Sequence, residues 1–339
     1  DWLARLPEAA IRRRPRLGFL ESWIGFHLLE PRRAYRGLKA ARRALGPGAH
    51  PMDDAAPGLT PAMLGELRTL IAGTLSAADH NRWSRDLALR WLPRLPKDQP
   101  FLSGVLANIL GFSHYTLGDM ALAAEAAERA HAEHTRSRSV FGIVYADLIL
   151  ALVEKARGRL GAAQALLERA RRLARETQGS PSYSEALVAV FLGELAYERG
   201  DLAEADRLLS ENNYIIEGTA LIVHALAGHL HLARLAALQG REQSALEILD
   251  RAEKLGRDRL YRRLRAGVLN DRVRLLLQLG DLAGAQAALR RAGLQNERLL
   301  ASAPPPSPAV ELERVALARV LLAEQRPDAA LRILDELAA

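Results

Sequence analysis

Apolar and small residues recur along this chain with the spacing of amphipathic helices, and short glycine-containing turns interrupt them at regular intervals. The segment YERGDLAEADRLL (197–209) shows the pattern once: a helical run ends at glycine, a short polar turn follows, and a second run carries alanine and leucine on one face. Related turns stand at intervals of 40, 42, 40 and 40 residues, and their glycines are Gly118, Gly158, Gly200, Gly240 and Gly280. This period predicts a repeated helical hairpin.

Each turn has residues that suit the end of one helix and the start of the next. Glycine fits the end of the first helix because it has no Cβ to oppose a left-handed conformation. Asp119, Asp201 and Asp281 each follow a turn glycine directly. We expect their carboxylates to cap the second helix of each hairpin.

Small residues occupy fixed positions on both sides of the turns. An alanine stands five residues after every turn glycine, and a second one usually follows seven residues later, with Asn212 as the exception. Another small residue stands seven before most of the glycines, and Val273 breaks that column. We expect helix backbones to approach closely at these columns, which consist of Ala123, Ala163, Ala205, Ala245 and Ala285, of Ala130, Ala170, Ala252 and Ala292, and of Gly111, Ala151, Gly193 and Ala233.

Small residues facing each other across a helical hairpin are typical of the tetratricopeptide repeat, although the period here exceeds the usual one of about 34 residues. The flanking hairpins are more degenerate, and in the last one Gln325 takes the glycine position and Ala330 the alanine position. We therefore predict an all-α protein, a tetratricopeptide-like helical-hairpin superhelix (an α-solenoid) of about eight hairpins.

The same pattern predicts a single superhelical array over residues 1–339. It has degenerate hairpins in residues 1–97, regular repeats in 98–294 and a C-terminal hairpin in 309–339. The stretches 46–61 and 303–308 are dense in proline and glycine, which prevents helix. We expect loops between hairpins there, because helical pattern resumes after each.

Composition narrows the classes of function. The 47 basic and 40 acidic residues give a net charge of only +7, so the surface is mixed and direct contact with nucleic acid is not expected. No cysteine is present, which excludes disulfides and thiolate chemistry and suits a reducing cytoplasm. No apolar run has the roughly 18 residues of a membrane span. The chain starts without Met or a signal core, so we expect a cytoplasmic segment of a longer protein without a membrane partner.

The sequence contains no recognisable motif for catalysis, cofactor binding or metal binding. The sequence has no G-x-x-x-x-G-K-[ST], G-x-G-x-x-G, H-E-x-x-H or G-x-S-x-G motif. His131 and His134 are expected at an exposed helix end, and His224, His229 and His231 are expected to be packed or surface residues. We predict neither an enzyme nor a metal or cofactor site in this chain.

A binding surface is expected instead on the first helix of each hairpin, which lines the concave face of a tetratricopeptide array. Counting back from each turn glycine places aromatic rings and hydrogen-bonding groups on that face, as a polar organic ligand or a peptide requires. The alternative, that they only line a solvated superhelix, stays open. The candidates are Asn108, Phe112, Tyr115, Tyr145, Lys155, Glu194, Tyr197, Glu198, Arg234, Asn270, Arg274 and Gln278.

Three segments resemble one known family. The start DWLARLPEAAIRRRPRLGFLESW (1–23) is similar to the segment that begins the sensor region of MalT-like, LuxR-type ATP-dependent transcription activators. Residues 86–130 and 192–209 look like its middle repeats. The resemblance implies an ATPase before this chain, a helix-turn-helix domain after it, and an array that receives an inducer and controls ATP-dependent self-association. ATP and DNA would then be bound by parts outside these residues.

Two functions follow as alternatives. The first is the inducer-sensing and regulatory oligomerisation region of such an activator, with a small molecule or a partner protein in the superhelix groove. The second is a peptide-binding tetratricopeptide scaffold unrelated to transcription. An enzyme on a helical scaffold would need a convergent acid–base or metal constellation, which the sequence does not contain.

Overall fold

The computed structural model describes residues 5–6, 14–27, 30–45, 60–218, 221–294 and 307–338. Within these ranges the chain forms 17 α-helices, one short 3-10 helix and no strand, which confirms the all-α prediction. It divides into two compact units: unit 1 is Asp1–Leu195 with Thr219–Leu221, and unit 2 is Ala196–Gly218 with Ile222–Ala339. That residues 1–339 form one continuous array stays a prediction.

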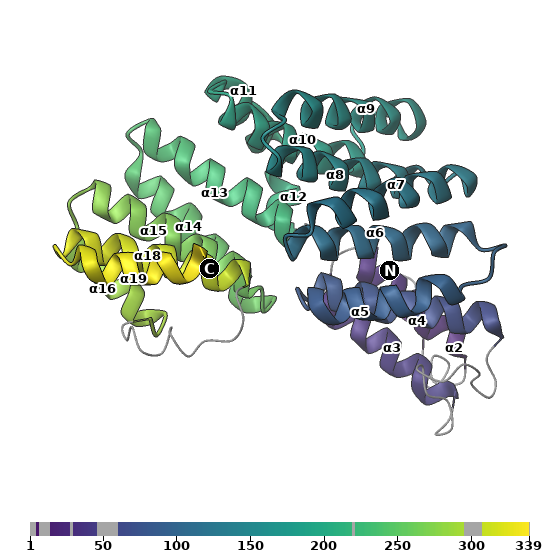
Figure 1. Cartoon of the computed structure of the whole chain (residues 1–339). Coiled ribbons are helices and arrows are strands. Elements are labelled where there is room, and N and C mark those ends of the chain that lie inside the picture. The colour runs from purple at the N-terminus through teal and green to yellow at the C-terminus, as the bar shows by residue number, and fades with distance from the viewer. Residues whose placement is uncertain are drawn as a thin grey trace. The chain divides into compact units, whose positions relative to one another are not determined.

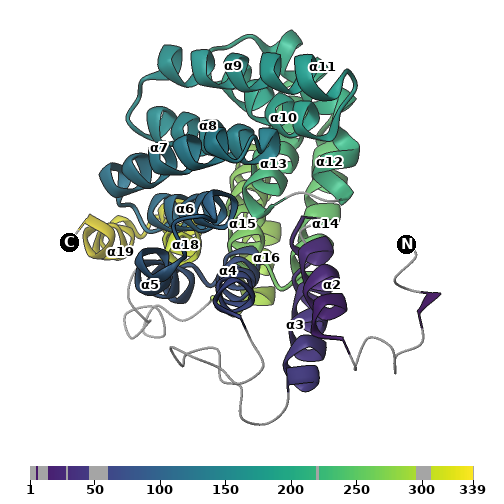
Figure 2. The ribbon, with the colours of Figure 1, turned by 90° about the vertical axis from the view of Figure 1, so that its right-hand side faces the viewer.

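Unit 1 is built from helical hairpins that stack on one another. Helices α2 and α3, α4 and α5, α6 and α7, and α8 and α9 pack as pairs, and α6 also contacts α4 and α8 (Figure 1). Figure 2 shows α4, α6 and α8 one above another. The bounds are α2 Pro15–His27, α3 Pro31–Leu45, α4 Pro61–Ala77, α5 Asn81–Trp91, η2 Leu92–Arg94, α6 Pro100–Thr116, α7 Met120–Arg136, α8 Val140–Ala156, α9 Leu160–Gln178 and α10 Tyr183–Glu198, whose last residues belong to unit 2.

Unit 2 repeats the same construction. Helix α13 pairs with α14, α15 with α16, and α18 with α19, while α15 also contacts α13 and α18. The bounds are α11 Leu202–Glu211, α12 Asn213–Gly218, α13 Ile222–Leu238, α14 Glu242–Asp258, α15 Arg262–Gln278, α16 Leu282–Arg291, α18 Pro308–Ala323 and α19 Pro327–Ala338.

The turn residues behave largely as their types require. The five turn glycines have φ between 69° and 91°, the left-handed region, and Gln325 in the glycine position has φ 59°. The carboxylates of Asp201 and Asp281 accept hydrogen bonds from the backbone N–H of Glu204 and Gly284, at 3.3 and 2.8 Å. Each therefore caps a helix as predicted.

The prediction that Asp119 caps a helix with its side chain was wrong. Its carboxylate Oδ2 lies 3.3 Å from Nδ1 of the buried His114 instead. The nearby histidine competes for the carboxylate that would otherwise turn toward the backbone N–H groups of α7.

The small-residue columns mark close helix contacts. Ala123, Ala163, Ala205, Ala245 and Ala285 are at most 1% exposed. A Cβ added to Gly111 would lie 3.2 Å from the backbone oxygen of Ala123, so helices α6 and α7 approach closely there. Ala330 of the last hairpin is also buried.

One member of these columns was assigned wrongly. Ala292 is exposed, because α16 ends at Arg291 and the residue that follows lies beyond the packed part of the helix. Of the predicted loops, residues 46–59 and 303–306 lie outside the described residues. Pro61 and Pro308 begin α4 and α18, with Thr60 and Ser307 as side-chain caps.

Candidate functional site

The candidates of unit 1 mostly hold the unit together. Asn108 of α6 is half-buried and donates a hydrogen bond of 3.0 Å from Nδ2 to the backbone oxygen of Gly142 in α8. Phe112 is 6% exposed and its ring centroid lies 6.5 Å from that of Tyr115. The Tyr145 ring lies 4.8 Å from the ring of Phe141. The hydrogen bond joins α6 to α8, whereas each of the two ring contacts lies within one helix.

Lys155 and Glu194 form an ion pair. The Nζ of Lys155 in α8 lies 2.6 Å from Oε1 of Glu194 in α10. Both line a void of only about 10 Å³, which Leu152 and Phe191 also line. A space of that size holds no more than about one water molecule. The pair therefore joins two helices without leaving room for a ligand.

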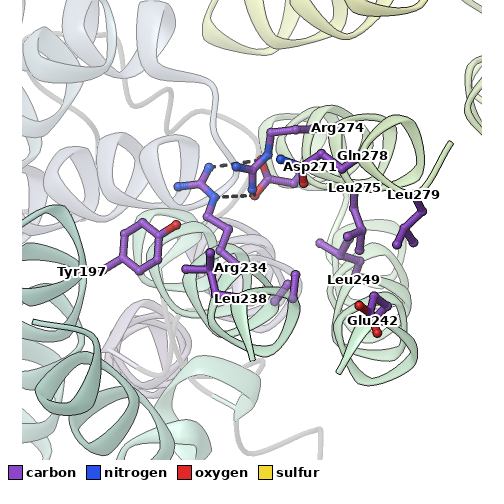
Figure 3. Close-up of a pocket in the computed structure, with 12 residues that line it drawn as sticks. Tyr197, Arg234, Leu238, Glu242, Leu249, Asp271, Arg274, Leu275, Gln278 and Leu279 are labelled. Atoms are coloured by element: carbon purple, nitrogen blue, oxygen red, sulfur yellow. Dashed lines mark hydrogen bonds and ion pairs between the residues drawn. The ribbon is translucent and has the colours of Figure 1, made fainter. Parts of the chain in front are cut away.

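Unit 2 has a larger pocket between α13, α14 and α15, with a volume of about 230 Å³ (Figure 3). Four predicted candidates line it: Tyr197 from the end of α10, Arg234 from α13, and Arg274 and Gln278 from α15. Arg274 and Gln278 reach it together because residues four apart lie on one face of a helix. This pocket is the candidate functional site.

Its polar end is a cluster of two arginines around one aspartate. Arg234 binds Asp271 in two places, with Nε 2.7 Å from Oδ2 and Nη2 3.1 Å from Oδ1. Nη2 of Arg274 lies 3.8 Å from the same Oδ2. The Asp271 side chain is only 3% exposed, so both guanidinium groups meet on a buried carboxylate, as Figure 3 shows. The two guanidinium groups thus share a single buried carboxylate, and the more exposed Glu198 adds a negative charge near Arg234.

Asp271 determines the charge state of the cluster. Burial, the largest single influence, lowers the pKa of the Arg234 guanidinium, while the hydrogen bond to Asp271, the charge of Asp271, and Tyr197 and Glu198 nearby raise it. The net result is a raised pKa, so Arg234 stays cationic. Nε of Arg274 is buried and has no hydrogen-bond acceptor among the residues that the structure describes. The second arginine thus keeps an unused donor.

His231 connects this cluster with Tyr197. Its Nδ1 lies 2.7 Å from the backbone oxygen of Ala227, an acceptor, so Nδ1 carries the hydrogen. Nε2 then accepts a hydrogen bond from Nη1 of Arg234 at 3.2 Å. The Tyr197 ring packs edge-on against His231, with centroids 4.9 Å apart. Glu198, the neighbouring candidate, has Oε1 3.5 Å from Nε2 and is half exposed.

Asn270 is the remaining candidate of this region and does not line the pocket. It is 9% exposed, and its Oδ1 has no hydrogen-bond partner within the described residues. Counting back from the turn selected Asn270 and passed over its neighbour Asp271. One signal pointed to Asp271: it is the sole acidic residue in α15, beside five arginines.

The exposure predicted for the histidines was partly wrong. His134 is 1% exposed and wedged between Gly104 and Gly142, so the expectation of an exposed helix end was wrong for it. Burial lowers its pKa to about 4. His224, His229 and His231 are all buried. The described part of the chain has no group of three or more His, Asp or Glu residues placed to hold a metal ion.

A second cavity of unit 2, of about 380 Å³, lies on another face of α15, where Arg265 and Arg272 are among the residues that line it. Arg272 is neutralised there by Asp250 at 2.8 Å and by Glu253 at 3.3 Å. Across the described ranges no helix is both long and apolar enough to span a bilayer.

Comparison with known proteins identifies the family of this helical-repeat region and its structural neighbours. Residues 65–339 match the family described as the MalT-like TPR region. The serine/threonine-protein kinases PknK of Mycobacterium tuberculosis and Mycobacterium bovis are 28% identical over 283 residues. The match covers 81% of this chain and 24% of each kinase, so the chain spans about a quarter of the length of these relatives.

Two solved structures share the fold. A Rap protein complexed with competence and sporulation factor matches with a TM-score of 0.61 and 15% identity, over 96% of both chains. The Rap conjugation gene regulator of the plasmid pLS20, in complex with the Phr* peptide, matches with a TM-score of 0.58 and 10% identity, over 93% of this chain and 98% of that one. At these identities the similarity shows the fold alone, and it confirms the prediction of a helical-repeat protein.

Proposed function

This chain belongs to the family of MalT-like TPR regions, and from this premise we propose that it is the inducer-sensing and self-association region of a bacterial ATP-dependent transcription activator. In this proposal the unit 2 pocket binds a small molecule. ATP and DNA are bound by parts of the full protein outside these residues, and this chain itself performs no catalysis. The full protein works in the cytoplasm.

The observation that carries the proposal is the arrangement of the pocket. Arg234 and Asp271 stand 37 residues apart on α13 and α15, the first helices of two successive hairpins, and meet at its polar end. Apolar side chains such as Leu275 line the rest. A pocket with a few convergent polar groups on an apolar wall is the usual form of a small-molecule site.

Its position also supports a regulatory role. A ligand in this pocket touches two successive hairpins at once, so its binding depends on the angle between them. A ligand that binds one such arrangement more tightly shifts the population toward it, by no more than its difference in affinity for the two states. The shift then reaches the rest of the full protein through the stacked helices.

The test is a metabolite screen that compares the wild-type chain with a variant of a pocket arginine. Ligand-observed NMR and thermal unfolding would compare the wild-type chain with Arg274→Gln, and with Arg265→Gln as a control on another face of α15. We expect at least one metabolite to bind wild type and Arg265→Gln and to lose at least tenfold in affinity with Arg274→Gln. Binding that ignores Arg274, or a screen without a hit, would contradict the proposal.

A peptide-binding scaffold is the second candidate function. The two Rap structures were solved with a peptide or with competence and sporulation factor, and they share this fold over nearly the whole chain. The kinase relatives show that arrays similar to this one also occur in proteins other than transcription activators. Retention of a defined peptide by the wild-type chain, with no metabolite bound at the pocket, would favour this alternative.

A further inference from the structure

We propose that the unit 2 pocket recognises a small monocarboxylate with a short, uncharged apolar tail. This inference rests on the proposed function, because it names the chemical class of ligand for the same pocket. Four observations support it: the exposed part of the Arg274 guanidinium, the single buried carboxylate that two arginines share, the exposed leucines of the wall, and the acidic residue at the far end.

The unused donor calls for an acceptor. Both oxygens of Asp271 already receive hydrogen bonds from Arg234. The 3.8 Å between Arg274 and Asp271 Oδ2 is too long for a hydrogen bond, and the buried Nε of Arg274 has no acceptor among the described residues. The Arg274 side chain is 32% exposed and lines the pocket, so the accessible part of its guanidinium can bind a ligand, and an anionic oxygen is the acceptor that a guanidinium binds best.

The charge of the cluster selects a monoanion. Two guanidinium groups share the one buried carboxylate of Asp271, so a single ligand carboxylate is enough to pair with the second guanidinium. A phosphate monoester would bring up to two negative charges beside the buried Asp271 and would leave one of them without a partner. The volume of about 230 Å³ is also below the roughly 300–1,000 Å³ of sites for drug-sized ligands, so the ligand is small.

The wall of the pocket selects an apolar tail. Leu238 at the end of α13 is 62% exposed, and Leu279 just after α15 is 48% exposed. Both line the pocket with Leu275 and Ala237. An aliphatic tail would cover these side chains, and each methylene that is fully buried tightens binding by about fourfold.

Glu242 limits the far end. It lines the pocket from the first turn of α14, and Figure 3 shows it beside Leu249 and apart from the arginine cluster. A second carboxylate on the ligand would approach Glu242, and like charges repel across a small pocket. The ligand tail is therefore neutral rather than acidic.

The experiment titrates the 339-residue chain with butanoate, pentanoate, hexanoate and adipate by ligand-observed NMR. We expect affinity to rise about fourfold for each added methylene of the monocarboxylates. Adipate, with a second carboxylate, should bind at least tenfold more weakly than hexanoate. Glu242→Gln should remove most of that difference.

Two arginine variants complete the test. Arg274→Gln should lower hexanoate affinity at least tenfold, while Arg265→Gln on the same helix should leave it unchanged. Far-ultraviolet circular dichroism would check that both variants remain folded. Hexanoate that binds Arg274→Gln as tightly as wild type, or adipate that binds as tightly as hexanoate, would overturn the inference.

The same series separates two sources of the carboxylate. N-acetyl-Ala-Leu carries the carboxylate of a peptide C-terminus, and its C-terminal amide is the control that should not bind. If the dipeptide binds more tightly than hexanoate, the natural carboxylate comes from a peptide terminus. If it binds more weakly, the natural ligand is a free acid. Either result supports a monocarboxylate ligand, provided that Arg274→Gln abolishes the binding. If the screen finds a metabolite whose binding depends on Arg274 but which is not a monocarboxylate, this inference is overturned and the proposed function stands. If the screen finds no ligand whose binding depends on Arg274, both are overturned.

Discussion

An ion pair joins first helices of successive hairpins in each unit, but the two pairs have different surroundings. In unit 1, Lys155 and Glu194 balance one another at 2.6 Å beside a void of about 10 Å³. In unit 2, two arginines share Asp271 beside a pocket of about 230 Å³. An ion pair in a filled space joins helices, while a second guanidinium next to open space can bind a ligand.

The different surroundings of the two ion pairs can be traced to residues at equivalent positions of the repeat. Glu194, Arg234 and Arg274 each stand six residues before a turn glycine, and Phe191 and Asp271 each stand nine before one. The large Phe191 ring lines the small void of unit 1, whereas Asp271 is much shorter and leaves space in unit 2. At this position of the repeat, unit 1 has a ring beside the small void, and unit 2 has the carboxylate that binds the arginines.

The largest effect should come from removing Asp271. Asp271→Ala would leave two partly buried guanidinium groups without their shared carboxylate, and we expect a loss of about 3 kcal/mol in the free energy of unfolding. Glu194→Gln in unit 1 should cost about 1 kcal/mol, because Lys155 reaches water when its partner is neutral. Urea unfolding of the two variants measures both values. Equal losses in the free energy of unfolding would show that the two ion pairs contribute equally to stability.

The next effect tests how tightly unit 1 is filled. A Cβ at Gly142 would collide with the ring of His134, so Gly142→Ala should destabilise the chain by about 2 kcal/mol. Gly161→Ala in α9 is the matched control: nothing lies within 4 Å of its added Cβ, and alanine favours helix by about 0.5–1 kcal/mol. Thermal unfolding should therefore shift in opposite directions. A neutral Gly142→Ala would mean that this part of unit 1 has room to adjust.

A change of pH should act on both units through buried histidines. Burial lowers the pKa of His134 in unit 1 to about 4 and that of His224 in unit 2 to about 3, from 6.5. The unfolded chain then binds more protons than the native chain below pH 6.5, so stability is complete above 6.5 and falls as the pH drops toward the native values. Between pH 7.5 and 5 each histidine should cost about 2 kcal/mol. His134→Asn and His224→Asn should each flatten the urea-unfolding profile across this range, and an unchanged slope would contradict the assignment.

The smallest effect concerns stability without ligand. Arg274 is 32% exposed and lies 3.8 Å from Asp271, so Arg274→Gln should change the free energy of unfolding by less than about 0.5 kcal/mol. Arg234, with two hydrogen bonds to Asp271, should cost more when changed to Gln. A large loss for Arg274→Gln in urea unfolding would make Arg274 a structural residue, like Lys155, rather than part of a binding site.

The hairpins were predictable because the contacts that define them are local. A glycine at the turn and an alanine five residues later act on residues that are neighbours in sequence, so Gly200 and Ala205 could be assigned directly. Asp119 and Ala292 were misjudged because His114 and the end of α16 intervene, and neither follows from the spacing of the column.

The sequence by itself determined the helical repeat, its turns and the set of side chains on its first helices, since these depend on the period of one helix and on backbone conformation at the turn. Only the tertiary structure decided which of those side chains meet. Arg234, Asp271 and Arg274 share one pocket because α13 and α15 pack side by side, while Asn270, one residue from Asp271, lies outside it. A rotation of about 100° per residue around a helix separates those neighbours, and the volumes of the surrounding side chains decide where space remains.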